Sequence, residues 1–170
     1  ANHVRLAAEA GRQAVRNAWQ GPRPNELATR KAFENAVAVD MALGGSTNAI
    51  VHLLAMAGRS GVDLNLDDFD VISRRMPLLA NLRPSGEFLM DDFYAAGGLC
   101  ALLNQMGDLL HLDVPTINGN TLGENIEDRQ VFNNQVIRNR DHPLAENGGT
   151  AVLRGNLAPD GAVIKHSAAT

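Results

Sequence analysis

The spacing of apolar residues changes along this chain, and that change limits how the chain can fold. Up to about residue 110, apolar side chains recur every three or four positions, as in amphipathic helices. After about residue 149 the pattern becomes strand-like, in residues 149–155 and 162–165. Segment 125–147 is polar and irregular. The sequence therefore predicts a helix-rich part, a linker over 125–147 that contains a domain boundary, and a β part.

Glycine, proline and capping residues divide the helical part. Thr29 is a candidate N-cap for a helix over residues 30–43, in which Phe33, Val37 and Met41 form one apolar stripe. Gly44 is expected to end that helix. The other elements that we expect are helices over 4–19, 47–58 and 90–106, a short helix from 66 that Pro77 stops, a strand over 116–118, one helical turn at 121–124, and turns at 84–86 and 159–161.

Two of these expected helices have an unusual composition. Residues 49–56 are apolar almost all round, which is typical of a buried helix. The helix over 90–106 contains Gly97 and Gly98, and two glycines inside a helix cost about 1 kcal/mol each relative to alanine. We therefore expect a close backbone contact or a kink at this pair.

Composition and charge exclude several classes of protein. The formal net charge of the 170 residues is −4 and the basic residues are scattered, so nothing indicates nucleic-acid binding. No apolar run is long enough to span a bilayer, and we recognise no signal peptide. Cys100 is the only cysteine, which excludes an internal disulfide and a multi-cysteine metal site built from this chain alone. We expect a reduced, cytoplasmic setting.

The residues after the glycine pair are the first candidate for a binding site. Ser46, Thr47 and Asn48 stand at an expected helix start, where free N–H groups and the helix dipole favour a carboxylate. The alternative is a corner between two helices with a Ser or Thr cap, and residue chemistry alone favours that alternative. His52 could face the same site as an acid, base or ligand, although a hydrogen-bonded histidine on a buried helix is the simpler interpretation.

Acidic residues gather at two other expected helix starts. Asp67, Asp68 and Asp70 open one helix, and Asp91 and Asp92 open another. Paired carboxylates can hold a metal or exchange protons, but acids are also the usual residues of a helix's first turn. We therefore favour capping for both clusters.

The remaining candidates are isolated residues. Cys100 lies among apolar residues, as core cysteines do. His142 and His166 have no partner nearby in the sequence, and the turn at 84–86 with Glu87 is a weaker candidate. The chain carries no phosphate-binding glycine loop, no His-Glu-x-x-His pair and no nucleophile elbow.

Six segments together resemble the dihydroxy-acid and phosphogluconate dehydratase family, in order and in spacing. They are KAFENA at 31–36, ALGGSTN at 42–48, LDDFD with ISR at 66–74, PSG at 84–86, MDD with AGG at 90–98, and AVL with GNLAPDG at 151–161. The resemblance covers essentially the whole chain, which would be well under half of a family member. Because the chain also begins without an initiator methionine, we expect an internal piece of a longer protein.

The resemblance implies an α/β fold, with the helix-rich end of a large α/β domain in residues 1–124 and the first strands of a smaller β-barrel-like domain in 148–170. It implies a hydro-lyase that converts a 2,3-dihydroxy acid to a 2-keto-3-deoxy acid with a [2Fe-2S] or [4Fe-4S] cluster and Mg²⁺. The family's cluster cysteines lie upstream, and its metal-binding glutamate and serine base lie downstream. No catalytic or metal-binding residue is therefore carried over, and Ser46, Thr47 and Asn48 are the expected substrate-binding residues.

Two substrate classes stay open. Residues 92–99, 118–125 and 156–161 look more like members that dehydrate sugar acids such as arabinonate, xylonate or gluconate. Members of branched-chain amino-acid biosynthesis, which act on dihydroxy-isovalerate, are the second candidate. The resemblance also implies a cytoplasmic homo-oligomer, a dimer or tetramer, without nucleic-acid or membrane partners. Outside the enzymes, the alternative is a non-catalytic scaffold or binding module.

Overall fold

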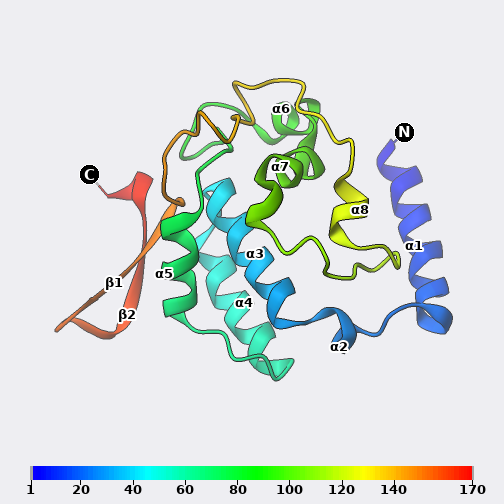
Figure 1. Ribbon diagram of the computed structural model, residues 1–170, viewed down its shortest axis with the longest axis horizontal. Helices are drawn as coiled ribbons and strands as arrows, with labels where there is room; N and C mark the ends of the chain where they lie inside the picture. The colour runs from blue at the N-terminus through cyan, green and yellow to red at the C-terminus, as the bar shows by residue number, and fades with distance from the viewer. Residues whose placement is uncertain (1, 170) are drawn as a thin grey trace.

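The computed structural model describes residues 2–169, in which helices form the main body and a β-hairpin packs on one side (Figure 1). None of the helices in this range combines the length and the apolar character that crossing a membrane requires. In chain order the elements are α1 (Asn2–Gln20), α2 (Pro24–Leu27), α3 (Arg30–Leu43), α4 (Thr47–Arg59), α5 (Leu66–Arg75), α6 (Met90–Ala95), α7 (Gly98–Met106), the 3-10 turn η1 (Gly107–Leu109), α8 (Leu122–Ile126), β1 (Thr150–Gly155), β2 (Ala158–Lys165) and η2 (His166–Ala168).

The junction between α3 and α4 follows the capping signals in the sequence. The Thr29 hydroxyl accepts a hydrogen bond from the Ala32 N–H at 3.3 Å, which begins α3 at the expected residue. Gly44 ends α3 with a left-handed backbone, φ 61°. The Ser46 hydroxyl accepts the Asn48 N–H at 3.2 Å and begins α4. These predicted boundaries are confirmed.

One part of the core lies between α3 and α5, and the same cluster continues to Leu102 and Met106 of α7. The predicted stripe of Phe33, Val37 and Met41 is buried, and Phe69 and Ile72 of α5 are buried in the same cluster. Burial of five large apolar side chains contributes roughly 1.5–3 kcal/mol each before the entropy of ordering them is subtracted.

The predicted capping role of the acidic clusters is confirmed for one residue of each. Asp68 accepts the backbone N–H of Asn65 at 2.9 Å, at the start of α5. Asp92 accepts the N–H of Leu89 at 2.8 Å, at the start of α6. Both carboxylates are therefore explained by helix structure.

The C-terminal hairpin has its turn at a different place from the one expected. β1 and β2 are antiparallel, and Gly155 pairs with Ala158, which leaves a two-residue turn at Asn156 and Leu157. The turn predicted at 159–161 is wrong, because those residues belong to β2. Proline is tolerated there because a two-stranded sheet leaves one side of β2 without a ladder partner.

Two other elements also differ from the sequence expectations. The single helix expected over 90–106 is wrong, because it is divided at Gly97, whose φ is 116°. The close backbone contact expected at the glycine pair is confirmed, since a Cβ on Gly97 would lie 2.6 Å from the Gln130 carbonyl oxygen. The strand expected over 116–118 is wrong as well. Those residues form a tight loop that the Thr116 N–H closes on the Asn120 carbonyl at 2.8 Å.

The apolar composition of α4 does not bury it on all sides. Ile50 and Ala57 are buried, whereas Val51 is 65% exposed and His52 is exposed, so the expectation of an all-round buried helix is wrong. Cys100 is also exposed, rather than a core residue. In both cases hydrophobic side chains lie on surfaces that no described residue covers.

Segment 125–147 is irregular, as expected, but it is not detached from the helical body. Val136 and Ile137 are buried. The Arg138 N–H donates to the Leu79 carbonyl at 2.8 Å, and the Leu78 N–H donates to the Ala145 carbonyl at 2.9 Å. The segment therefore packs against residues 78–82 and leads the chain to the hairpin.

Candidate functional site

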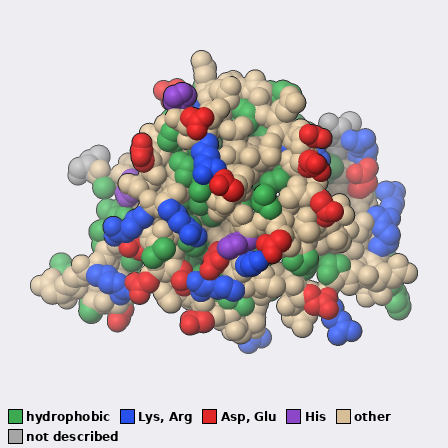
Figure 2. Space-filling model, viewed as in Figure 1, with side chains coloured by type: hydrophobic (Ala, Val, Ile, Leu, Met, Phe, Trp, Pro, Cys, Tyr) green, Lys and Arg blue, Asp and Glu red, His purple; other side chains and the backbone are tan. Residues whose placement is uncertain are grey.

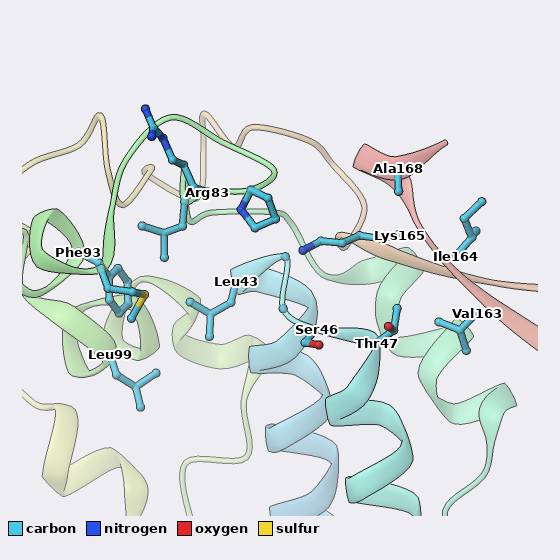
Figure 3. A pocket seen from close by; sticks show the side chains of 15 residues that line it. Leu43, Ser46, Thr47, Arg83, Phe93, Leu99, Val163, Ile164, Lys165 and Ala168 are labelled. Atoms are coloured by element: carbon cyan, nitrogen blue, oxygen red, sulfur yellow. The ribbon is translucent and has the colours of Figure 1, made fainter. Parts of the chain in front are cut away.

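A cavity of about 840 Å³ opens where α3 ends and α4 begins (Figure 3). It is bounded by this turn, by the loop before α6, by α6 and α7, and by the end of β2. Its wall is mainly apolar, with two hydroxyl and two basic side chains. The lining residues are Leu43, Gly44, Gly45, Ser46, Thr47, Leu82, Arg83, Pro84, Met90, Phe93, Leu99, Val163, Ile164, Lys165 and Ala168.

Glycines allow the hairpin and the turn to approach closely at the cavity. A Cβ on Gly149 would lie 2.6 Å from the Gly44 Cα, and the Gly149 N–H donates to the Met41 carbonyl at 3.1 Å. The buried Ser73 hydroxyl donates to the Thr150 carbonyl. The start of β1 is therefore fixed against the end of α3 and against α5.

A partly buried carboxylate lies behind this turn. A Cβ on Gly45 would lie 1.9 Å from Asp40 Oδ1, and Asp40 Oδ2 is buried without a hydrogen-bond partner among the described residues. Burial raises the pKa of the Asp40 carboxyl to about 6, and the positive charge of Lys165 acts in the opposite direction. A carboxyl with such a pKa can change its protonation state near neutral pH.

The structure brings two of the three predicted substrate-binding residues to the cavity. Ser46 and Thr47 line it, whereas Asn48 does not. All three side chains are exposed, and the Ser46 hydroxyl also caps α4. Their placement agrees with both interpretations of the sequence, a helix cap and a binding wall, and their role in binding stays a prediction.

Sequence reasoning missed Asp40 and Lys165. Each had one available signal: Asp40 interrupts an apolar stretch of α3 just before the glycine pair, and Lys165 ends the apolar run of β2. They are 125 positions apart by their numbers (165 minus 40), so only the docked hairpin brings them together. No local pattern encodes that meeting.

A second charged cluster has a structural role. The Arg30 guanidinium pairs with Glu34 and Asp68, and His111 Nε2 lies 2.6 Å from Glu34 Oε2. Partial burial acts to raise the pKa of the Glu34 carboxyl, but hydrogen bonds from Arg30 and His111 hold it below its usual value. The cluster joins α3 to α5 and to the loop at His111. On the face seen in Figure 2, acidic and basic side chains are likewise interspersed.

The described residues do not form a metal centre by themselves. Within residues 2–169, no three His, Cys, Asp or Glu side chains are grouped so that they could hold a metal ion. The lone Cys100 cannot hold an iron–sulfur cluster, which requires several cysteine ligands.

Comparisons with known proteins identify the family to which the chain belongs. The family model described as dihydroxy-acid/6-phosphogluconate dehydratase N-terminal matches residues 1–125, and the corresponding C-terminal model matches residues 135–170. The chain belongs to this family, whose members are hydro-lyases.

Its relatives carry more than one substrate name. The dihydroxy-acid dehydratase of Caldicellulosiruptor bescii is 50% identical over 99% of this chain and 31% of that protein. The dihydroxy-acid dehydratase of Acetivibrio thermocellus is 49% identical over 99% of the chain and 31% of that protein. The L-arabinonate dehydratase of Rhizobium leguminosarum is 47% identical over 97% of the chain and 29% of that protein. The chain thus spans about a third of the length of these curated relatives.

Proposed function

We propose that a full-length protein carrying this chain removes water from a short 2,3-dihydroxy acid to give a 2-keto-3-deoxy acid. The family membership supports this reaction class, and the cavity at the α3–α4 turn gives the chain a part in it. In this proposal residues such as Ser46 and Thr47 form one wall of the substrate site. They bind and orient the acid, and the groups that break the carbon–oxygen bond come from outside the chain.

We propose dihydroxy-isovalerate, or a similar branched acid, as the substrate. The observation that carries this choice is the apolar wall formed by Leu43, Phe93 and Leu99. A branched hydrocarbon chain gains free energy against such a wall, whereas the hydroxyls of a sugar acid would lose hydrogen bonds to water there. Several relatives named as dihydroxy-acid dehydratases support the same choice. The order of substrates expected from sequence segments is therefore reversed in this proposal.

A sugar acid is the second candidate. It is supported by the relative named as an L-arabinonate dehydratase, whose identity to the chain is almost as high as that of the other two. The hydroxyls of Ser46 and Thr47 give the cavity one polar side that a sugar hydroxyl could use.

The remaining expectations belong to the same proposal. We propose that the full-length protein uses an iron–sulfur cluster and Mg²⁺ whose ligands lie outside this chain, and that it works as a cytoplasmic homo-oligomer. We also propose a domain boundary within 125–147, an interpretation supported by the separate family models that end at residue 125 and begin at 135.

Turnover by the full-length protein tests the reaction and the substrate. The protein is reconstituted anaerobically with iron, sulfide and Mg²⁺, and 2-keto acid formation is measured on dihydroxy-isovalerate, arabinonate, xylonate and gluconate. We expect the highest kcat/KM on dihydroxy-isovalerate. A preference for arabinonate would overturn the substrate choice. The absence of turnover on all four acids would overturn the dehydratase proposal and favour a non-catalytic scaffold.

Substitution of Thr47 tests the binding wall. Thr47→Val removes the hydroxyl and keeps the shape, and we expect kcat/KM to fall about tenfold, the value of one hydrogen bond to a charged substrate. Ser46→Ala should have a similar effect, together with about 1 kcal/mol of lost helix capping. Ser60→Ala, which removes an exposed hydroxyl at the other end of α4, is the matched control. Unchanged kinetics in the two cavity variants would remove Ser46 and Thr47 from the site.

A further inference from the structure

Lys165 has a fixed place at the edge of the cavity. It is one of only two lysines in the chain, and it ends β2, where it pairs with Thr150. The next residue, His166, donates its N–H to the Gly149 carbonyl at 3.0 Å. Because Gly149 packs against Gly44, the position of the end of β2 is fixed relative to the α3–α4 turn.

The Lys165 side chain extends from β2 toward that turn (Figure 3). Its ammonium makes no hydrogen bond within the described residues and no ion pair closer than 4.0 Å with their carboxylates. The positive charge of Lys165 acts to lower the pKa of the nearby Asp40 carboxyl. That carboxyl packs against Gly45 and forms no ion pair with Lys165 within the described residues. Lys165 is partly buried as a residue, and an ammonium without a partner at such a place is suited to bind an anion.

The other basic residue of the wall is differently placed. Arg83 Nε donates to the Glu87 carbonyl at 3.1 Å, and its side chain points away from Lys165 in Figure 3. Lys165 is therefore the basic side chain of the wall that reaches toward the α3–α4 turn. Phe93 and Leu99 lie on the side away from Lys165, so the wall is charged at one end and apolar at the other.

We propose that Lys165 binds the carboxylate of the acid substrate and makes the cavity selective for acids over their neutral analogues. This inference rests on the proposed function, and it also gives the substrate a direction. The carboxylate lies at the junction of β2 and the α3–α4 turn, and the hydrocarbon end points toward α6 and α7. The hairpin, which also lines the cavity with Val163 and Ile164, thus contributes a specificity-determining side chain to the site.

The test compares an acid with its own amide. The ligands are 2-hydroxyisovalerate and 2-hydroxyisovaleramide, which have the same shape and lack the 3-hydroxyl that the reaction removes. Their dissociation constants are measured by calorimetry on the full-length protein, with and without Lys165→Met. The wild-type protein should bind the acid about ten- to a hundredfold more tightly than the amide. In Lys165→Met the affinity for the acid should fall by that factor, and the affinity for the amide should stay the same.

Two further variants make the result interpretable. Lys165→Arg keeps the charge and should retain most of the preference for the acid. Lys31→Met removes the other lysine, which pairs with Asp113 on the surface, and should leave both affinities unchanged. An unchanged amide affinity in Lys165→Met also establishes that the cavity is intact.

Equal preference for the acid in the wild type and in Lys165→Met would overturn the inference. The proposed function fails separately, by the absence of turnover on every dihydroxy acid. The calorimetric comparison reads binding alone and does not depend on turnover, so the two failures are distinguishable.

Discussion

Asp40 is the residue whose burial has the clearest consequence for stability. Its pKa is about 6 in the folded chain, against about 4 for an unperturbed aspartate. Between these pH values the folded state binds more protons than the unfolded state, so the free energy of unfolding falls as the pH rises from about 4 to 6. Asp40→Asn should remove this loss. We expect a flatter pH profile and about 1 kcal/mol of added stability at pH 7, less than the full linkage value because the carboxyl is only partly buried.

Urea unfolding between pH 4 and 8 measures this effect. Lys165→Met serves as the second arm, because the charge of Lys165 lowers the pKa of Asp40 and its removal should extend the falling part of the profile to higher pH. Superimposable profiles for the wild type and Asp40→Asn would contradict the assignment of a raised pKa to Asp40.

Gly149 is the residue on which the close approach of the hairpin depends. A Cβ at this position would lie 2.6 Å from the Gly44 Cα, a backbone atom that cannot rotate away. Gly149→Ala should therefore destabilise the fold by about 1–3 kcal/mol, as overpacking does. Gly58→Ala is the matched control, because Gly58 lies in α4 with open space around its Cα. Alanine at position 58 should raise the free energy of unfolding by at most about 1 kcal/mol. Thermal unfolding measures the stability of the two variants. Equal stabilities would argue against the close contact between Gly149 and Gly44.

At the scale of elements, capping residues predicted the helix boundaries that depend only on neighbouring residues. The caps at Thr29 and Ser46 placed two helices, because a capping hydroxyl needs only the residues next to it. Contacts distant in sequence decided the rest. Gly97 divides a helix because the chain at Gln130 passes over it. The hairpin turn falls at 156–157, which pairing of the strands selects, and not at the proline.

The hairpin is attached to α5 by a buried hydrogen bond that a single substitution can remove. The Ser73 hydroxyl donates to the Thr150 carbonyl, and Ser73 is buried. Ser73→Ala leaves that carbonyl without its partner, and we expect a loss of about 1–3 kcal/mol. Chemical denaturation measures it, with the exposed Ser60→Ala as the control. A loss no larger than the control's would mean that water replaces the bond and that α5 does not hold the hairpin through Ser73.

At the scale of the whole molecule, the candidate site lies where the helical body meets the hairpin. The sequence predicted the half that belongs to one segment, the α3–α4 turn with Ser46. It did not predict Lys165 on the same cavity, because that meeting depends on the docking of β1 against Gly44. Composition also misled at α4 and Cys100, where apolar side chains are exposed. Apolar periodicity identifies the side of a helix that is suited to burial, but it does not identify which part of the protein covers that side.

The helix α1 lies at the opposite end of the molecule from the hairpin and depends little on the rest (Figure 1). Val15 is 63% exposed and Trp19 is 84% exposed, and the Asn17 side chain donates one hydrogen bond to the Ile117 carbonyl at 3.0 Å. Most of the stability of a helix in a protein comes from tertiary packing of its apolar face, and α1 has little of it. We therefore expect amide hydrogens of α1 to exchange at least about a hundredfold faster than those of α3 in this chain. Hydrogen exchange read by mass spectrometry resolves the two segments. Equal protection of both helices would mean that α1 packs against the body in solution, and the exposed Trp19 would then show the blue-shifted emission of a buried indole.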